Sequence, residues 1–360
     1  MFKIKKKIKN IYKFFIYEIF KLFYGKVLIK KKIDVLVNRS QDIFFKKENL
    51  NYQTHIIKNA RIYTDYVSNV AVISKNNLYK KTSFEGINSK KKNFKFSEIL
   101  KQGTPKFKKK FEGTVLSLVQ GASGSNYFHW MFDILPKIFI CSKNISLNNI
   151  NYLYLPEMNM LQKKTLKLLN IKSKIINSKK FRHISADRII TIDHPWYKGG
   201  YFSKYSMNIP SWIIFWLRKK FLKKKKKFKC DKRIYIDRTD SKFKHSQIIN
   251  SNETYKLLQK YNFKKYKIAN LNFFKQIYLF WNSKFIISAH GAALTNLIFC
   301  KKKTRVIEIR SKKNFGQYFE RISKINKLNY SLIKTKKVTS YSGDIVVPLS
   351  KLENLIINKI

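Results

Sequence analysis

Residues 233–309 alternate between short apolar runs and amphipathic stretches, and this alternation constrains the fold more than any other feature of the sequence. The apolar runs of strand length lie at 233–238, 263–268, 285–287 and 305–309, and the helical stretches between them lie at 250–260, 273–281 and 292–299. Either Asn250 or Ser251 can cap the first of these helices. Such alternation predicts a parallel sheet with helices on both faces, whose ligands lie at the carboxyl ends of the strands.

A His-Gly-Ala turn joins the strand 285–287 to the helix predicted at 292–299. Gly291 has no side chain that would keep a ligand away from the backbone. The first turn of the helix offers unpaired N–H groups and a partial positive charge, and His290 adds a further donor. This junction therefore fits a phosphate group, although a packing glycine beside a hydrogen-bonded histidine is equally compatible with these residues alone.

A second motif runs from Asn126 to Pro136 and reads Asn-Tyr-Phe-His-Trp-Met-Phe-Asp-Ile-Leu-Pro. It predicts a helix from His129 to Cys141. On that helix His129 and Asp133 share one face, about 6 Å apart at Cβ. The preceding turn, 121–125, is rich in Gly and Ser and places His129 near an opening. Strands predicted at 71–74, 113–119, 150–156 and 188–192, with a helix at 160–169, make this half a second α/β unit.

The two motifs together resemble glycosyltransferase family 61. The C-terminal signature of that family is an Arg at a strand end, an Asn-x-x-Glu helix start, a Gln within a helix, His-Gly-Ala-x-Leu-Thr-Asn, and a Glu that ends a strand. The matching residues here are Arg238, Asn250 with Glu253, Gln276, His290 to Asn296, and Glu308. The N-terminal signature, Asn-Tyr-x-His-Trp followed by an acid and Leu-Pro, matches Asn126 to Pro136. At one position the chain departs: Gln247 stands where the family often has an Arg, so a phosphate contact from there is in doubt.

The resemblance implies an α/β, GT-B-like fold, with two Rossmann-type domains facing a cleft. The C-terminal half would hold a nucleotide-sugar, expected to be UDP-linked, and the N-terminal half would present a glycan or lipid-linked glycan acceptor. The implied reaction is an inverting hexosyl or pentosyl transfer in surface polysaccharide synthesis, such as that of capsule or lipopolysaccharide. The donor is a substrate, and neither a cofactor nor a metal is expected.

The resemblance also assigns donor-binding residues. Arg238, His290 and the N–H groups after Gly291, beginning with Ala292, are expected to bind the diphosphate. The matching positions Asn250 and Gln276 complete the donor-binding set, although Gln276 could instead be a helix cap or a surface group. Asn296 is expected to brace the turn. Glu308 is expected to accept hydrogen bonds from the ribose hydroxyls, with an ion pair to a lysine as the alternative.

For the general base, the candidates are His129 and Asp133, and the sequence does not rank them. His183, His194 and Asp187 come next. Tyr127 and Trp130 lie beside the candidate base and could either stack a sugar or pack in the core.

Two acidic clusters are candidate metal ligands, namely Asp193-His194 and Asp237-Arg238-Thr239-Asp240. A metal-binding Asp-x-Asp motif needs substrate phosphates and a position in the cleft. Asp237 and Asp240 read instead as a strand end and a turn, and no metal site is predicted.

The charge of the chain favours another class of protein. Lys and Arg number 77 against 20 Asp and Glu, for a formal net charge of +57, which is typical of nucleic-acid binders. However, the lysines are spread along the whole chain with abundant Asn and Ile, as an AT-rich genome would encode them. No zinc-finger spacing, RNP pattern or basic-zipper heptad is present. We therefore expect no nucleic-acid partner, and keep a nucleic-acid binder and a non-catalytic glycan-binding homologue as alternatives.

Four segments are predicted along the chain. They are a basic-aromatic arm at 1–32, an acceptor-side α/β domain at 33–218, a Lys-rich linker or loop at 219–229, and a donor-side Rossmann-like domain at 230–360. A run of like charge such as 219–229 cannot pack in a core. Cys141, Cys230 and Cys300 have no ligand spacing, so a reducing compartment fits.

The arm mixes lysines with aromatic and aliphatic residues. Lys13, Glu18 and Lys21 interrupt its apolar stretch, so it is neither a usual signal peptide nor a span of a bilayer. Either it lies on an anionic membrane surface or it packs on the domain as an ordinary helix. The expected location is cytoplasmic, with peripheral attachment to the inner face of the membrane as an open alternative.

Overall fold

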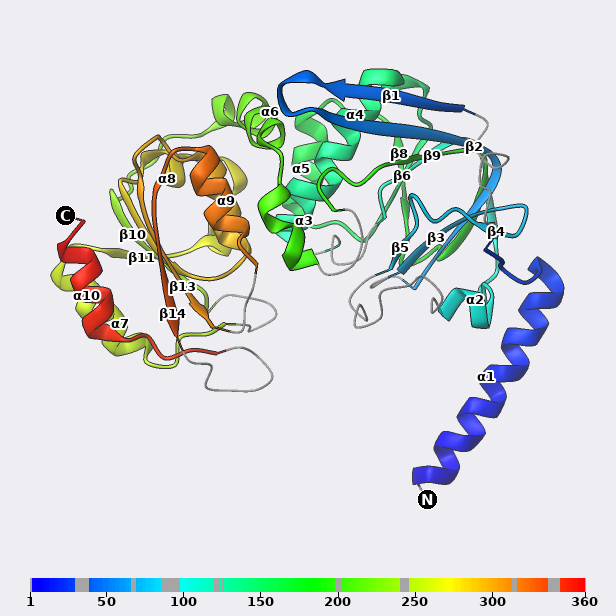
Figure 1. The fold of residues 1–360 in the computed structure, drawn as a ribbon, viewed down its shortest axis with the longest axis horizontal. Helices are drawn as coiled ribbons and strands as arrows, with labels where there is room; N and C mark the ends of the chain where they lie inside the picture. The colour runs from blue at the N-terminus through cyan, green and yellow to red at the C-terminus, as the bar shows by residue number, and fades with distance from the viewer. Residues whose placement is uncertain are drawn as a thin grey trace. The chain divides into compact units, whose positions relative to one another are not determined.

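The computed structural model describes residues 2–29, 39–65, 69–85, 98–119, 124, 126–197, 202–239, 246–312, 316–335 and 344–359. The chain divides into two compact units, Met1–Tyr201 and Phe202–Ile360 (Figure 1). The division falls upstream of the Lys-rich stretch 219–229, which belongs to the second unit and begins inside a helix.

The second unit is built on a five-stranded parallel sheet with the order β11-β10-β12-β13-β14. Its strands are β10 (Arg233–Asp237), β11 (Lys264–Lys267), β12 (Phe285–Ala289), β13 (Arg305–Ser311) and β14 (Asn329–Thr335). From β10 the chain passes to β11 on one side and then to β12 on the other, so the strand order reverses between β10 and β12. The first four strands confirm the predicted alternation, whereas β14 was not predicted.

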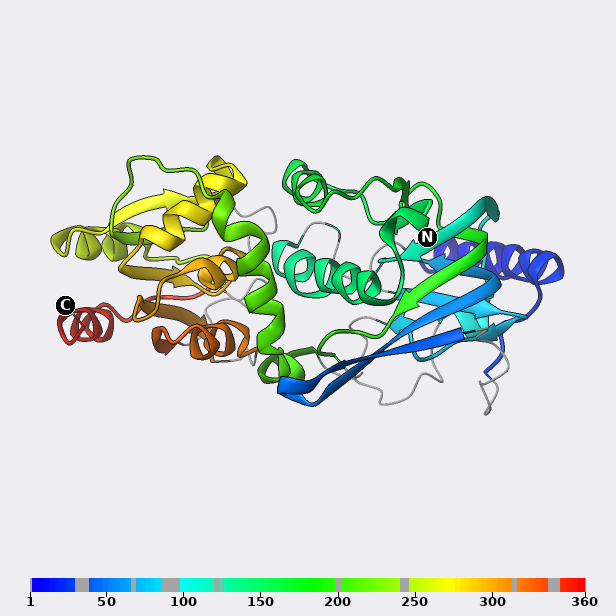
Figure 2. The ribbon, with the colours of Figure 1, turned by 90° about the horizontal axis from the view of Figure 1, so that it is seen from above.

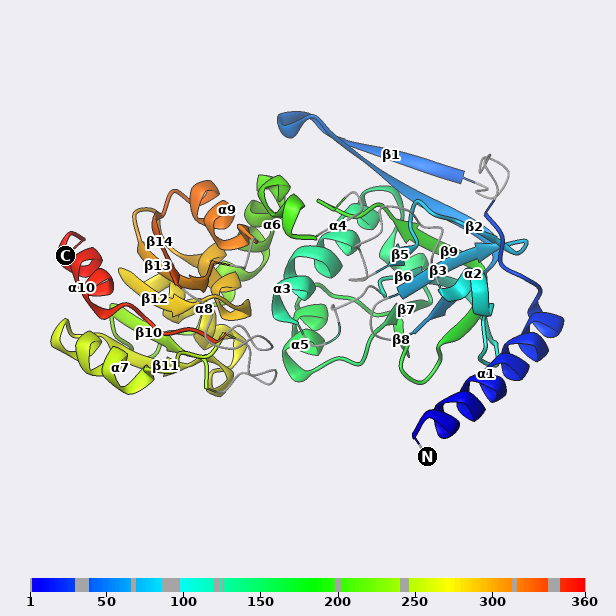
Figure 3. The same cartoon turned by 60° about the horizontal axis from the view of Figure 1, so that its bottom comes forward.

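Helices cover both faces of this sheet, as Figures 1 and 3 show. They are η5 (Phe202–Asn208), α6 (Ser211–Phe221), η6 (Leu222–Lys224), α7 (Ser251–Lys260), η7 (Ile268–Asn270), α8 (Phe273–Asn282), η8 (Ala292–Phe299), α9 (Tyr318–Ile325) and α10 (Leu349–Ile357). Helices α7 and α10 pack side by side on one face, where Leu258 and Leu352 meet Phe285 and Ile287. Helices α6, α8, α9 and η8 contact one another on the opposite side. Burial on both faces explains why β10, β12 and β13 read as apolar runs.

The first unit contains a nine-stranded mixed sheet with the order β4-β3-β2-β9-β6-β7-β8, in which β1 also pairs with β2 and β5 with β3. Its strands are β1 (Arg39–Phe45), β2 (Leu50–Thr64), β3 (Asn69–Ser74), β4 (Asn77–Leu78), β5 (Phe84–Glu85), β6 (Lys109–Ser117), β7 (Tyr152–Leu155), β8 (Lys174–Asn177) and β9 (His183–Ile192). Only β9, β6, β7 and β8 are mutually parallel. The α/β class is therefore confirmed, and the sheet of this half is mixed, with antiparallel strands β1 to β5 beside the parallel ones.

Short turns explain the antiparallel half. A turn at 46–49 joins β1 to β2 in the long hairpin drawn in blue in Figure 2. Strands β3 and β4 are joined by Lys75 and Asn76, which both have positive φ, at 44° and 60°. A two-residue loop with this geometry connects neighbouring antiparallel strands. The usual Asn-Gly signal is missing here, so the sequence pattern did not reveal this hairpin.

The first unit also contains helices. They are α1 (Phe2–Tyr24), η1 (Lys46–Glu48), α2 (Glu98–Gln102), α3 (Tyr127–His129), η3 (Trp130–Ile134), α4 (Leu135–Asn144), η4 (Leu147–Asn149) and α5 (Met160–Leu168). In the part of the chain that the structure describes, no helix combines the length and the apolarity needed to cross a bilayer.

The helix that carries His129 starts earlier than predicted. The Asn126 side chain caps it by accepting hydrogen bonds from the N–H groups of Phe128 and His129, at 2.9 and 3.4 Å. Segment η3 within it is a π-helical turn, in which the Leu135 N–H donates to the Trp130 carbonyl. Such turns are frequent at functional sites. Of the predicted Gly-Ser turn at 121–125, only Gly124 is among the described residues.

Candidate functional site

Arg238 and the His290-Gly291 pair lie at the carboxyl ends of two adjacent strands. Arg238 follows β10 and His290 follows β12, and these strands are parallel neighbours, with Ile236 opposite Ser288. The strand order reverses between them, which in a doubly wound sheet opens the crevice where ligands bind. The fold thus brings together two residues that are 52 positions apart in the sequence.

The guanidinium of Arg238 lies directly against Gly291. A Cβ atom added to Gly291 would be 2.0 Å from Nη1 and 2.2 Å from Cζ of Arg238. The backbone itself does not demand glycine, because its φ of 166° is extended. Glycine is needed at this position because any side chain would displace the Arg238 guanidinium.

His290 is held by a buried carboxylate. Its Nδ1 lies 2.5 Å from Glu308 Oε1, and the Tyr330 hydroxyl donates to Glu308 Oε2 at 2.6 Å. Glu308 is 1% exposed, whereas the His290 side chain is 15% exposed. Burial, followed by the charge of Glu308, raises the pKa of the Tyr330 phenol above its usual range, which keeps it a donor. Both Glu308 oxygens are thus engaged within the protein, and no lysine among the described residues forms an ion pair with it. The ribose contact stays a prediction.

Gln276 and Asn296 form a buried contact behind the His290-Gly291 turn. Gln276 is buried rather than at the surface, and its Nε2 donates to the carbonyls of Ile268 and Leu271 at 3.1 and 2.8 Å. Its Oε1 accepts from Asn296 Nδ2 at 3.3 Å. This contact ties helix α8 to η8, the helix that follows Gly291. Neither side chain is therefore displayed on the surface for a ligand.

Asn250 joins the start of α7 to the segment before α10. Its Nδ2 donates to the Val347 carbonyl at 2.9 Å, and its Oδ1 accepts from the Val347 N–H at 2.8 Å. It stands at the N-cap position without a side-chain capping bond, so capping by Asn250 is wrong. Its role in donor binding is untested. Nearby, Gln247 Nε2 donates to the Arg238 carbonyl at 3.1 Å, so it supports the segment that carries the guanidinium.

The helix after Gly291 is a 3-10 helix. Segment η8 has the predicted bounds, Ala292–Phe299, and its first turn closes with the Leu294 N–H donating to the Gly291 carbonyl at 3.0 Å. The N–H groups at the start of such a helix have no partner within it. The Arg238 guanidinium lies beside this start of the helix, at Gly291.

The first unit places a second polar cluster at the carboxyl ends of parallel strands. The helix that carries His129 follows β6, while Asp193 and His194 directly follow its neighbour β9. From β6 the chain continues to β7 on the opposite side of β6 from β9. The strand order therefore also reverses at this point.

Asp133 is the centre of this cluster. It is fully buried and its Oδ2 lies 2.7 Å from His129 Nδ1. Its Oδ1 accepts from the Trp196 indole N–H at 2.9 Å and lies 3.6 Å from His194 Nε2. Burial alone would raise the pKa of Asp133, but the charges and hydrogen bonds of His129 and His194 outweigh burial and hold the pKa well below its usual range. Asp133 is thus an ionised carboxylate that orients its neighbours.

His194 is held as a neutral donor to this carboxylate. Its Nδ1 accepts from the backbone N–H groups of Trp196 and Tyr197, which leaves the proton on Nε2, facing Asp133. Burial lowers the pKa of His194 to about 4, against the opposing effect of Asp133. One helical turn beyond Asp133, burial lowers the pKa of Lys137 to about 8, although Asp133 and Asp193 oppose it.

The other candidate bases lie elsewhere. His183 is at the start of β9, where its Nδ1 contacts the Lys106 carbonyl and its Nε2 contacts Arg61. Burial lowers the pKa of His183 to about 4. Asp187 is half-exposed in the middle of β9 and accepts from the Gly113 N–H. Neither joins the cluster at Asp133.

The aromatic and acidic candidates have structural contacts. Trp130 is buried and its indole N–H donates to Thr165 at 2.9 Å, which is a core contact. Asp237 accepts from the Thr239 N–H in a turn, and Asp240 lies outside the described residues. Asp193 accepts from the Gln53 N–H and contacts His55. Among the described residues, no group of His, Cys, Asp and Glu is arranged to hold a metal ion.

Comparison with known proteins decides the family. The model of the family Glycosyltransferase 61 matches residues 127–307, about half of the chain. The chain belongs to glycosyltransferase family 61. A search of curated proteins gave no match. Membership implies transfer of a glycosyl group from a sugar donor to an acceptor, and it confirms the resemblance seen in the sequence. The matched range runs from the His129 helix to the His290-Gly291 turn, whereas Glu308 and Tyr330 lie beyond it.

Three members of these clusters escaped sequence analysis of this family 61 protein. Tyr330 lies on β14, a strand that was not predicted, and it follows the matched range. Trp196 is 63 residues from Asp133, and no spacing connects them. Lys137 is one turn along the same helix, at i+4 from Asp133, which is a signal that could have identified it.

Proposed function

We propose that this member of family 61 transfers a sugar, with inversion, from a nucleotide-sugar to a glycan or lipid-linked glycan acceptor. A UDP-linked donor and a role in surface polysaccharide synthesis are part of the proposal. The observation that carries it is the Arg238 guanidinium resting on Gly291 beside His290, at the strand-order reversal. A cation, an imidazole and helix N–H groups at one crevice suit a diphosphate.

In the proposed nucleotide-sugar site, three kinds of group stabilise the negative charge that develops on the leaving diphosphate. Arg238 supplies a permanent cation, and the start of η8 supplies backbone N–H groups. His290 is positioned by Glu308, which binds Nδ1 and leaves Nε2 for the diphosphate. Tyr330 in turn fixes Glu308. The role of Glu308 in this proposal is to orient His290.

In the proposed acceptor site, His129 is the general base and Asp133 orients it. Asp133 is fully buried and engaged by three donors, whereas the His129 side chain is 16% exposed. While its Nδ1–H donates to the Asp133 carboxylate, His129 takes the acceptor hydroxyl proton on Nε2. The acceptor oxygen then bonds to the anomeric carbon while the bond from that carbon to the diphosphate breaks. The electron pair leaves with the nucleoside diphosphate.

The GT-B arrangement belongs to this proposal. In it the second unit holds the nucleotide-sugar and the first unit presents the acceptor, so that the two reaction centres meet in a cleft. Support comes from the fact that each unit has its own polar cluster at the carboxyl ends of parallel strands. The purified chain tests this when incubated with a nucleotide-sugar panel and an acceptor library. Transfer supports the proposal, and binding of nucleotide-sugars without transfer or hydrolysis would favour a non-catalytic homologue.

Activity is expected to survive removal of divalent cations. The expectation rests on Arg238, His290 and the η8 terminus, which can stabilise the leaving diphosphate without a bridging cation. The measurement is sugar transfer before and after dialysis against EDTA. Loss of transfer that Mn²⁺ or Mg²⁺ restores would contradict metal-free chemistry and would direct attention to Asp237 and Asp193.

Helix α1 supports peripheral attachment to a membrane. Its apolar side chains are exposed at spacings of three and four residues, the pattern of one helix face: Ile4, Ile8, Ile11, Phe15, Ile19 and Leu22. Its last turn is anchored, since the Tyr24 carbonyl accepts from Arg61 and the Tyr24 ring lies 4.8 Å from that of His183. We propose that this apolar face lies in an anionic leaflet, which the lysines of the same helix attract.

Replacing three residues of this face should detach the protein from vesicles. Ile8→Ser, Ile11→Ser and Phe15→Ser together remove apolar area that would enter the leaflet, so binding to anionic vesicles should fall about tenfold or more. Co-sedimentation with the vesicles measures the binding. The control replaces three exposed apolar residues elsewhere, Ile175, Phe215 and Ile249, with Ser and should bind as before. Equal binding by the α1 variant and the wild type would show that α1 is not a membrane element.

A further inference from the structure

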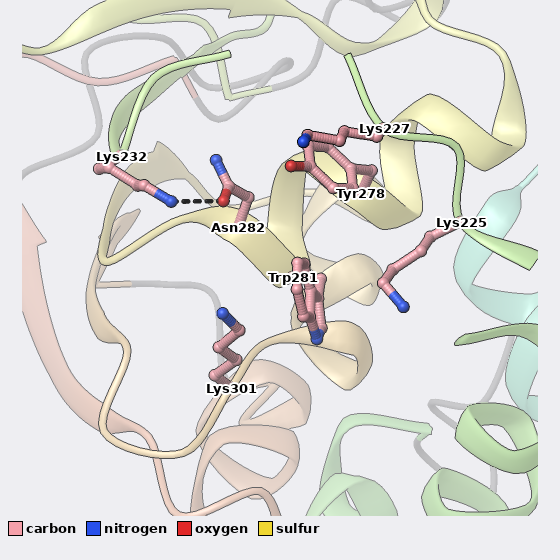
Figure 4. Close-up of a pocket in the computed structure, with 7 residues that line it drawn as sticks. All are labelled: Lys225, Lys227, Lys232, Tyr278, Trp281, Asn282 and Lys301. Carbon is pink, nitrogen blue, oxygen red and sulfur yellow. Dashed lines mark hydrogen bonds between the residues drawn. The ribbon is translucent and has the colours of Figure 1, made fainter. Parts of the chain in front are cut away.

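A cavity of about 510 Å³ lies in the second unit, away from the Arg238 site (Figure 4). Its walls come from the Lys-rich stretch after α6, the end of α8, and the segments that precede β10 and β13. Four lysines line it: Lys225, Lys227, Lys232 and Lys301. The stretch 219–229, expected to be a linker or loop, thus provides a wall of this cavity.

Trp281 stands between two of these lysines. The ammonium groups of Lys225 and Lys301 lie 4.6 and 3.8 Å from the centroid of the indole ring, on either side of it in Figure 4. The Tyr278 ring packs against the indole at 5.7 Å. Each ammonium gains from the ring quadrupole without being neutralised. The aromatic wall therefore gathers positive charge at the cavity.

A third lysine is positioned by an amide. Lys232 Nζ donates to Asn282 Oδ1 at 2.5 Å, and Asn282 is itself buried. An amide oxygen fixes an ammonium in place without cancelling its charge. Among the described residues that line the cavity, none is acidic. Four ammonium groups around one cavity repel one another, and a bound anion would remove that repulsion.

The cavity is separate from the proposed donor site. Lys232 precedes β10, Asn282 ends the helix before β12, and Lys301 precedes β13, so the cavity is at the amino-terminal edge of the sheet. Arg238 and His290 are at the carboxyl-terminal edge. The five residues of β10 alone separate the two edges by about 16 Å.

We propose that this cavity, the lysine–tryptophan pocket, binds a ligand that carries two or more phosphate groups. A phosphate carries about 1.5 to 2 negative charges at neutral pH, so two phosphates match four ammonium groups. A lysine ammonium is a compact point charge suited to phosphate oxygens. The ligand is either a soluble polyphosphorylated molecule or the phosphorylated head group of a lipid. The pocket stands independently of the donor assignment.

Calorimetric titration of the full chain with inorganic tripolyphosphate tests the pocket. The titration is carried out in the Arg238→Ala background, so that binding at the carboxyl-terminal edge does not contribute. We expect saturable binding that the double change Lys225→Gln and Lys301→Gln weakens about tenfold or more. The control, Lys223→Gln with Lys224→Gln, makes the same change of net charge at exposed positions outside the pocket and should change Kd less than about twofold.

Two results would overturn the proposal. One is equal weakening by both double variants, because it would show general attraction to lysines. The other is absence of saturable tripolyphosphate binding.

Vesicles that contain a bisphosphorylated lipid distinguish a lipid head group from a soluble ligand. They are tested with a chain that also carries the three α1 changes. Tighter binding to these vesicles than to tripolyphosphate assigns a lipid head group, and the reverse assigns a soluble ligand. A failure of nucleotide-sugar binding at Arg238 would leave these titrations unaffected.

Discussion

His129→Ala is expected to lower kcat by about 10² to 10⁴-fold while leaving donor affinity nearly unchanged. The reason is that the proposed base acts on the acceptor hydroxyl, whereas the diphosphate is proposed to bind in the other unit. Asp133→Asn should have an effect of similar size, because an amide cannot accept from His129 and Trp196 as the carboxylate does. The double variant should lower kcat little more than the worse single variant does, since the two side chains act together in one proton transfer.

The measurement is the transfer rate on a defined acceptor, with the Kd of the donor determined in parallel. Asp187→Asn is the matched control, since Asp187 is half-exposed on the same unit and does not contact the cluster. Its rate should equal that of the wild type. Thermal unfolding of each variant separates lost chemistry from lost folding. Near-wild-type transfer by both His129→Ala and Asp133→Asn would reject the proposed base.

Arg238→Ala and His290→Ala should each weaken donor binding by about 1.5 to 3 kcal/mol, or roughly ten- to 150-fold. Each removes one charge-assisted hydrogen bond to the diphosphate. Gly291→Ala should also weaken binding, by about tenfold, because its Cβ would occupy the place of the Arg238 guanidinium. This third variant removes no polar group, so its effect reports on geometry alone.

Calorimetric titration with the donor measures all three variants. The control is Arg233→Ala, an arginine at the opposite end of the same strand, where it donates to the Tyr261 carbonyl. The donor Kd should be unchanged in that variant. If Arg238→Ala and His290→Ala both fold and bind the donor as the wild type does, the site at the strand-order reversal is wrong.

The sequence predicted the second unit well because its inner strands β10, β12 and β13 are buried on both faces. Runs such as Phe285 to Ile287 have the length and content of central strands in a covered sheet, and the stretches between them have the length of crossover helices. The parallel order that follows places Arg238 beside Gly291. The first unit was harder, because the turn at Lys75 and Asn76 that folds β3 back on β4 has no glycine signal.

The detailed contacts of the site could not be predicted, because they join distant parts of the chain. Glu308 holds His290 through a register between β12 and β13, and Tyr330 reaches it from β14. Similarly, the choice of His129 over Asp133 as the base depends on Trp196. This residue follows the carboxyl end of β9, and its indole N–H donates to the Asp133 carboxylate. Burial of one member of a pair is a property of tertiary packing and leaves no periodic trace in the sequence.

The central claim is that a nucleotide-sugar binds through Arg238 in a protein whose base is His129. A thermal-shift panel of UDP-, GDP- and CMP-sugars tests it most directly, because a ligand that binds only the folded state raises its Tm. One nucleotide class, expected to be UDP, should raise the Tm of the wild type and of His129→Ala by equal amounts, and should not raise that of Arg238→Ala at the same concentration. A panel in which no sugar nucleotide stabilises the wild type, or in which Arg238→Ala is stabilised equally, would contradict the account.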